Sequence, residues 1–164
     1  MLENKEKIFI HRFKGYWMDV GTYDSYHEAN LDLIKKSEEV GIDLYDENWK
    51  IYTASLNLPP HRIGKTGELC DCLVNEACVI DGKVCNSVLF SSVEVEEGAE
   101  VYNSVLLNGV KVKSGVKIYN CVVASDMEIT QNIGKEDDSK AVSYTHLTLP
   151  TTARRCRSRW SPYH

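Results

Sequence analysis

The stretch VCNSVLFSSVEVEEGAEVYNSVL, residues 84–106, carries the same six-residue pattern at both of its ends. The pattern returns as IYNCVV at 118–123, so the step is 17 residues each time. An imperfect copy, LCDCLV, lies at 69–74, which is 15 residues before the first full copy. Gly98 and Gly115 keep the same 17-residue step. A fixed period of this length is typical of stacked structural units.

The repeat predicts short strands rather than helices. Valine is dense within each copy, and glycine marks the turns EEGAE and KSGVK at 96–100 and 113–117. Strands that recur at a fixed step stack on one another at the sheet spacing of about 4.8 Å. We therefore expect a mostly β solenoid of about three to four coils over residues 63–130.

Cysteine shares its positions in the repeat with serine or tyrosine. One column holds Cys72, Ser87, Ser104 and Cys121, and another holds Cys70, Cys85, Tyr102 and Tyr119. A metal site needs converging ligands, whereas a stacked column needs only side chains that fit, so the pattern favours packing by small buried residues. A metal or disulfide role for the CDC motif is the alternative. Cys70 and Cys85 would lie within disulfide range if they stack, although a cytosolic setting disfavours the bond.

The N-terminal part predicts a strand, a turn and a helix. Residues 7–14, KIFIHRFK, alternate loosely between apolar and polar side chains, as strands do. A helix is predicted over 24–40, with Ser25 and Glu28 as a capping box and Gly41 as its stop. These elements are too few to form a core alone. We therefore expect the helix to lack a packing partner and the strand to expose an edge.

Residues 41–62 are predicted to be a linker. Pro59 and Pro60 impose an extended segment with few hydrogen bonds. Trp49 and Tyr52 are expected to form an apolar side of this linker that packs on the solenoid.

The predicted division of the chain is 1–40, 41–62, 63–140 and 141–164. The last segment breaks the repeat and holds four arginines and no acidic residue, while the first 140 residues hold all 24 acidic residues. A basic tail that binds nucleic acid or an acidic partner is one interpretation. The one we favour is that SYTHLTLPTT is similar to translated sequencing-adapter read-through, so that the tail is non-native and is either disordered or packed ad hoc.

Composition narrows the class of protein. Apolar residues make up 43% and charged residues 26% of the chain, as in ordinary globular proteins. The acidic body argues against nucleic-acid binding, which needs a basic face. No apolar run approaches the roughly 20 residues that span a bilayer, and the N-terminus lacks the layout of a signal peptide. We expect a cytoplasmic protein with no nucleic-acid or membrane partner.

Three stretches together resemble the C-terminal part of one enzyme family. GYWMDVGTYDSYHEANLDLI at 15–34 is similar to the motif that closes the nucleotidyltransferase domain of bacterial glucose-1-phosphate adenylyltransferase. DLYDENWKIYTASLNLPPHRI at 43–63 resembles the linker of that family, and residues 71–106 resemble its β-helix. The resemblance runs from about residue 7 to 140, and the three motifs occur in the order of the family.

The resemblance implies a fold and a reaction. The fold is a left-handed parallel β-helix of the hexapeptide type, preceded by a strand-turn-helix remnant of an α/β nucleotidyltransferase domain. The reaction transfers the adenylyl group of ATP to α-D-glucose 1-phosphate and gives ADP-glucose, for glycogen synthesis, and pyrophosphate. The family implies a homo- or hetero-oligomer built through the β-helix, typically a tetramer.

The resemblance also assigns two site residues. Asp19, in YWMDVGT, corresponds to one of two carboxylates that hold Mg²⁺ in the family, and Trp17 corresponds to a wall of the glucose pocket. From the residues alone, Asp19 could equally be a turn residue and Trp17 a core aromatic. The family's Gly-rich phosphate loop, second carboxylate and sugar-phosphate lysine have no counterpart in this sequence. We therefore expect this chain alone to be inactive and to contain no catalytic residue.

Three other functions are alternatives to a catalytic adenylyltransferase. An acyltransferase β-helix commonly uses a histidine on a coil, and the sequence has none between residues 62 and 145. His11 and His27 are expected to be surface or helix-face residues rather than catalysts. A non-catalytic assembly or regulatory paralogue of the same enzyme is the principal alternative, although the intact YWMDVGT motif favours the catalytic type. A β-helical module for subunit contacts is the third.

Overall fold

The computed structural model describes residues 9–53, 56–136 and 141–144. Two helices precede the strands along the chain, α1 (Tyr23–Asp32) and α2 (Ser37–Val40). The strands are β1 (Arg62–Ile63), β2 (Glu68–Val74), β3 (Val79–Ile80), β4 (Lys83–Leu89), β5 (Glu94–Val95), β6 (Glu100–Tyr102), β7 (Val105–Leu106), β8 (Lys111–Val112), β9 (Lys117–Tyr119), β10 (Cys121–Val123), β11 (Glu128–Ile129) and β12 (Val142–Tyr144). None of the helices in these described ranges has the length and apolarity that crossing a membrane requires.

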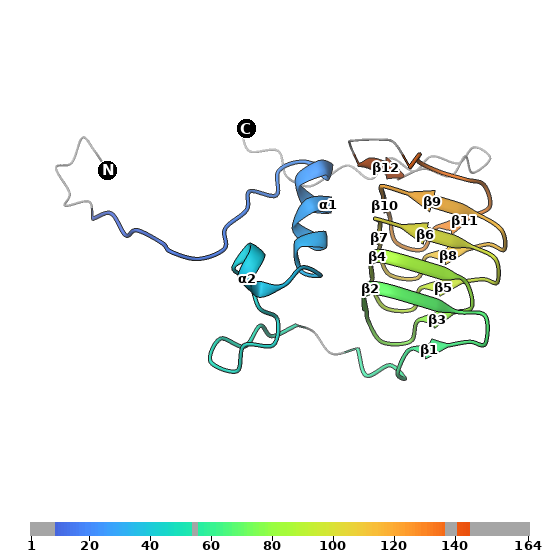
Figure 1. Ribbon diagram of the computed structural model, residues 1–164, viewed down its shortest axis with the longest axis horizontal. Coiled ribbons are helices and arrows are strands. Elements are labelled where there is room, and N and C mark those ends of the chain that lie inside the picture. Colours follow the sequence, from blue (N-terminus) through green and yellow to red (C-terminus); the bar gives the residue numbers. More distant parts are fainter. Residues whose placement is uncertain (1–8, 54–55, 137–140, 145–164) are drawn as a thin grey trace, which may run out of the picture.

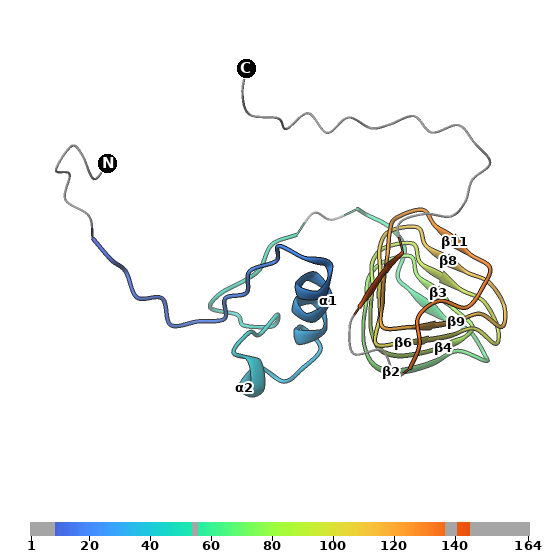
Figure 2. The same ribbon diagram turned by 90° about the horizontal axis from the view of Figure 1, so that it is seen from above.

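The strands form a parallel β-solenoid (Figure 1). One sheet has the order β1-β3-β5-β8-β11, and the other has the order β12-β10-β7-β4-β6-β9, with β2 paired to β4. Figure 2 shows the coils superposed around a common axis. The predicted mostly β solenoid of parallel strands is confirmed.

The strand register confirms the 17-residue period. Val84 pairs with Val101, and Val101 pairs with Ile118. The outward-facing column also stacks as expected, from Cys70 through Cys85 and Tyr102 to Tyr119. The rings of Tyr102 and Tyr119 lie 5.2 Å apart and are tilted by only 5°. Equivalent residues of successive copies therefore occupy equivalent places on successive coils.

The interior of the solenoid is filled by aliphatic columns. Its largest fully buried side chains are Ile80, Leu89, Leu106, Ile118, Ile129, Val84, Val93, Val95, Val101, Val105, Val110 and Val112. Serine fits this dry interior because its hydroxyl is used: Ser87 Oγ accepts a bond from Ser104 N, and Ser104 Oγ accepts one from Cys121 N, both at 3.1 Å. The cysteine–serine column is thus a packing column, as predicted.

One corner of each coil is turned by a residue in the left-handed backbone region. Asp71, Asn86, Asn103 and Asn120 have φ between 45° and 50°. Asparagine and aspartate tolerate this conformation better than other residues with a side chain. Asn86 Nδ2 donates to Asn103 Oδ1 at 2.8 Å, and Asn103 Nδ2 donates to Asn120 Oδ1. The corner residues therefore form an amide ladder that parallels the coil axis.

The prediction of a strand at 7–14 is wrong for residues 9–14, the part that the structure describes. Residues 9–14 have no regular structure, and Phe9 and Ile10 are 86% and 90% exposed. A strand needs a hydrogen-bonding neighbour, and no described segment pairs with this one.

The helix expected over 24–40 is two helices with a break at 33–36. It begins at Tyr23, one residue earlier than expected, and Thr22 rather than Ser25 is the N-cap. Gly41 ends α2 with φ of 78°, as the sequence predicted.

The expectation that the helix lacks a partner is also wrong. Leu31 of α1 packs against the outward-facing Val88, Val105 and Val122, and all four side chains are buried. Partly buried side chains surround this second apolar cluster: Tyr26, Ile34, Leu73, Phe90 and Leu107. The solenoid thus supplies a docking face for α1 (Figure 1).

One further expectation about the flanking segments is wrong. Trp49 and Tyr52 do not pack on the solenoid but are 70% and 87% exposed. Val142–Tyr144, in the tail expected to be disordered or packed ad hoc, form β12, which pairs in parallel with β10. The open edge of the last coil presents unpaired backbone groups, and such an edge accepts a strand with little regard to its sequence. Residues 145–164 of the predicted tail lie outside the described residues.

Truncating a central core side chain should destabilise the solenoid strongly. Leu106 is fully buried, so Leu106→Ala is expected to lower the free energy of unfolding by about 2–5 kcal/mol. Ile51→Ala, at a position that is 49% exposed, is the control and should have a much smaller effect. Urea unfolding followed by circular dichroism measures both, and equal effects would contradict the assigned core.

The ion pair between coils at Glu96 and Lys113 should make stability depend on acid pH. Glu96 Oε1 accepts a bond from Lys113 Nζ at 2.9 Å, and Glu96 Oε2 accepts one from Ser114 N at 3.0 Å. These two bonds hold the pKa of the Glu96 carboxyl below its usual range, and the bond from Lys113 makes the larger contribution. A lowered folded-state pKa adds stability above the unfolded-state pKa, and this stability is lost as the pH falls through the folded-state pKa.

Glu96→Gln is therefore expected to be less stable than the unchanged protein at pH 7 and equally stable well below about pH 4. Glu97→Gln, the exposed neighbour, is the matched control. Urea midpoints at the two pH values provide the measurement. A Glu96→Gln deficit that persists unchanged in acid would exclude the ion pair as its cause.

Candidate functional site

The GYWMDVGT segment is anchored by alternate side chains. Tyr16 and Met18 are half-buried, whereas Trp17 and Asp19 are exposed. The Tyr16 hydroxyl donates to Asp32 Oδ2 of α1 at 3.0 Å and lies 3.4 Å from Met18 Sδ. The segment is therefore fixed to the helix through Tyr16, while Trp17 and Asp19 remain exposed.

Asp32 is the polar anchor of this arrangement. It is buried, with 8% of its surface exposed, and Lys35 Nζ donates to its Oδ1 at 2.6 Å. Burial, followed by the bond to Asp32, raises the pKa of Tyr16, so the phenol stays protonated and donates. The bond to Asp32 raises the pKa of Lys35. The carboxylate of Asp32 is thus satisfied by one phenol and one ammonium group.

The segment passes into α1 through a reciprocal cap. Thr22 Oγ1 accepts a bond from Ser25 N at 3.1 Å, and Ser25 Oγ accepts one from Thr22 N at 3.0 Å. These bonds satisfy backbone donors that the first turn of a helix otherwise leaves unpaired. Asp19 therefore lies three residues before a well-defined helix start.

Trp17 and Asp19, the two predicted site residues, stand on the same exposed side of this segment. Trp17 is 75% exposed, so it is not a core aromatic here. An exposed carboxylate can serve as one ligand of Mg²⁺, which commonly takes one or two carboxylates and fills its shell with phosphates and waters. Within the described ranges, no three His, Cys, Asp or Glu side chains gather to hold a metal ion. The roles assigned to Asp19 and Trp17, as a Mg²⁺ ligand and a wall of the glucose pocket, stay predictions.

His27, expected to be a surface or helix-face residue, lies on the face of α1 that meets the solenoid and is buried. Only 8% of its surface is exposed, and its Nε2 lies 2.6 Å from the carbonyl oxygen of Asn103. A carbonyl only accepts, so Nε2 carries the proton of this bond. Asn103 is a corner residue of the amide ladder, so the bond ties α1 directly to the solenoid.

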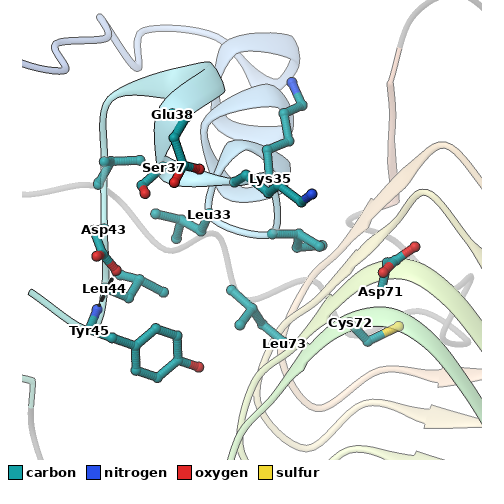
Figure 3. Close-up of a pocket in the computed structure, with 13 residues that line it drawn as sticks. Leu33, Lys35, Ser37, Glu38, Asp43, Leu44, Tyr45, Asp71, Cys72 and Leu73 are labelled. Atoms are coloured by element: carbon teal, nitrogen blue, oxygen red, sulfur yellow. Dashed lines mark hydrogen bonds between the residues drawn. The ribbon is translucent and has the colours of Figure 1, made fainter.

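A hollow lies between the end of α1, α2, the following loop and β2 (Figure 3). Figure 3 shows Leu73 extending from β2 toward the side of Leu33 and Leu44. The charged groups around it are of both signs: Lys35, Lys36, Glu38, Asp43 and Asp71. Neither Trp17 nor Asp19 lines this hollow.

The cysteines of the described part of the chain are all free: Cys70, Cys72, Cys78, Cys85 and Cys121. The CDC motif therefore forms neither a disulfide nor, within the same residues, a metal cluster. Burial raises the pKa of the Cys72 and Cys78 thiols, which are consequently poor nucleophiles.

The stacked coils define a hexapeptide-repeat β-helix. Residues 58–148 match the family described as GlmU-like, C-terminal hexapeptide, and the chain belongs to this family. The chain is 46% identical over 101 residues to a glucose-1-phosphate adenylyltransferase of Geobacillus stearothermophilus. Proteins of the same name from Bacillus mycoides (strain KBAB4) and Bacillus anthracis are 45% and 44% identical over the same length.

Each of these matches covers 62% of this chain and 26% of the relative. The chain thus spans about a quarter of the length of the curated relatives it matches. The expected resemblance to the C-terminal part of glucose-1-phosphate adenylyltransferase is confirmed over the 101 matched residues.

Sequence reasoning missed the docking of α1, although the signal was present. In SVL, SVL and CVV, at 87–89, 104–106 and 121–123, the middle residue faces outward and is nevertheless valine. Consecutive apolar residues in a strand indicate burial on both faces. A column of outward valines therefore required a covering element. The bond from Tyr16 to Asp32 had no comparable signal.

Removing the His27 side chain should loosen α1 from the solenoid. Losing one buried hydrogen bond and leaving the Asn103 carbonyl unpaired costs about 1–3 kcal/mol. In His27→Ala, the amides of α1 should therefore exchange with deuterium about tenfold faster or more, while those of β4 and β7 stay protected. Glu28→Ala, at an exposed position on the same helix, is the control. Unchanged exchange of α1 in His27→Ala would show that the apolar contacts alone hold the helix.

Proposed function

We propose that this chain is part of a glucose-1-phosphate adenylyltransferase, which transfers the adenylyl group of ATP to glucose 1-phosphate. The proposal rests on the similarity, at 44–46% identity over 101 residues, to proteins of that name. The chain would contribute the β-helix and one edge of the sugar-nucleotide site. ATP and glucose 1-phosphate would be the substrates of the whole enzyme, and the β-helix would carry contacts of a homo- or hetero-oligomer.

Asp19 would be one protein ligand of Mg²⁺ in that site. Its side chain is exposed and lies in a segment in which Tyr16 bonds to Asp32 of α1 and to Met18. The metal, when bound, would neutralise phosphate charge as two polyanions meet. The anchoring of Tyr16 to Asp32 would keep the Asp19 carboxylate in place.

Trp17 would form an apolar wall beside the glucose ring. It is exposed on the same side of the segment as Asp19, which suits contact with a ligand rather than with the core. A flat aromatic face next to a sugar excludes water from one side of the substrate and orients it. The two residues would thus act on the metal-bound phosphate and on the sugar.

A chimera tests the proposed function. Residues 9–136 of this chain replace the matching C-terminal part of the Geobacillus stearothermophilus relative, and formation of ADP-glucose from ATP and glucose 1-phosphate is measured with Mg²⁺. We expect an active chimera. Asp19→Asn in the chimera should lower kcat by about 100-fold or more, because a bound metal contributes several kcal/mol to the reaction.

Glu28→Gln is the matched control, since it removes an exposed carboxylate on α1 that has no assigned role. A folded chimera without activity would contradict the proposed function. An active chimera in which Asp19→Asn behaves like Glu28→Gln would retain the function and remove the metal role of Asp19. Trp17→Ala should mainly raise KM for glucose 1-phosphate.

A further inference from the structure

Two free cysteines stand directly over one another on adjacent coils. Cys70 of β2 and Cys85 of β4 are register partners in a parallel pair. Neighbouring strands lie about 4.8 Å apart, which is within the range of about 4.4–6.8 Å found between the Cα atoms of disulfide-linked residues. Both side chains belong to the outward column that continues as the stacked rings of Tyr102 and Tyr119.

The two thiols differ in their surroundings. Cys70, on β2 at the N-terminal end of the column, is exposed, whereas Cys85 is half-buried. Burial, followed by hydrogen bonding to the Cys70 thiol, raises the pKa of Cys85 to about 11. Cys70 is therefore the thiol that an external reagent meets first, and Cys85 is the slower partner beside it.

The other cysteines of the described residues are placed differently. Cys72 Sγ donates to the carbonyl oxygens of Cys70 and Val84, at 3.1 Å and 3.3 Å, and belongs to the inward column. Cys78 and Cys121 are buried. Among these five described cysteines, only the pair formed by Cys70 and Cys85 combines register, proximity and access from solvent.

We infer that Cys70 and Cys85 form a reversible dithiol–disulfide couple that reacts with small-molecule disulfides and staples β2 to β4. This site is independent of the proposed adenylyltransferase function. Among the described strands, β2 pairs only with β4, so the bond would secure the terminal strand of its sheet.

The chemistry is thiol–disulfide exchange in two steps. The Cys70 thiolate attacks one sulfur of a disulfide such as oxidised glutathione and expels one small thiolate, which leaves a mixed disulfide on Cys70. The Cys85 thiolate then attacks the Cys70 sulfur and expels the second small thiolate. Two protein thiols are oxidised, and the disulfide is reduced to two thiols.

The register also indicates that the bond is easily reversed. Side chains directly opposite on parallel strands hold their Cβ atoms near the strand spacing, which exceeds the roughly 3.5–4.5 Å usual in disulfides. Such a bond forms with some strain, and strained, exposed disulfides are the readily reduced ones. An excess of reduced thiol should therefore restore the two cysteines.

Mass spectrometry of the whole chain tests the inference. For this experiment Cys156 is replaced by serine (Cys156→Ser), so that the remaining cysteines are those that the structure describes. It is incubated under native conditions with oxidised glutathione, alkylated in acid and digested with trypsin. We expect the loss of two free thiols and a disulfide joining the peptides 66–83 and 84–111, reversed by dithiothreitol.

Three variants assign the bond to its residues. Cys70→Ser and Cys85→Ser should each abolish the linked peptides, and Cys72→Ser should keep them. Serine suits position 72 because Ser87 and Ser104 occupy the same column. A link that persists in Cys70→Ser, or adducts of glutathione without a link in the unchanged pair, would overturn the inference.

Hydrogen exchange tests the staple itself. In the oxidised chain the amides of β2 should exchange at least about tenfold more slowly than in the reduced chain, while those of β9, at the far end of the same sheet, stay unchanged. Equal exchange of the β2 amides in both forms would show that the disulfide adds no stability to the pairing of β2 with β4, and would overturn the proposed staple.

Discussion

In-register stacking of parallel coils is the constraint on which this structure depends. Each coil supplies the hydrogen-bond partners of the next and places equivalent side chains over one another, as in the column Val84, Val101 and Ile118. Two polar side chains inside the stack use the same register: Ser87 and Ser104 each accept a hydrogen bond from a backbone N–H one coil on. A shift of register would place these hydroxyls among aliphatic side chains without partners, at a cost of roughly 1–3 kcal/mol for each.

The outer surface of the solenoid follows from the same constraint. A column of outward valines runs along one face, and α1 buries it through Leu31. The bond of His27 to the Asn103 carbonyl joins that helix to the corner ladder of asparagines. Tyr16 in turn joins the preceding segment to Asp32 of the helix. The position of the YWMDVGT motif is thus linked, contact by contact, to the stacked coils.

The hexapeptide-repeat family accounts for the coils but not for a complete reactive centre. The described residues present Trp17 and Asp19 on one exposed side and gather no cluster of metal ligands around them. An adenylyltransferase site built with these two residues would draw its remaining groups from other parts of the enzyme. Under the proposed function, this region would hold one carboxylate and one aromatic ring at a defined place.

The sequence by itself determined the period, the strand register and the interior columns, because a parallel stack makes equivalent residues recur at a constant step. It also indicated the motif with Asp19 and the end of α2 at Gly41. Only the tertiary structure decided that residues 9–14 form no strand, that the helix breaks after Asp32, and that α1 docks on the solenoid. These outcomes depend on which segments meet across 50 or more residues, as His27 meets Asn103. Local pattern carries no information about such a meeting unless both partners show an unexplained apolar face.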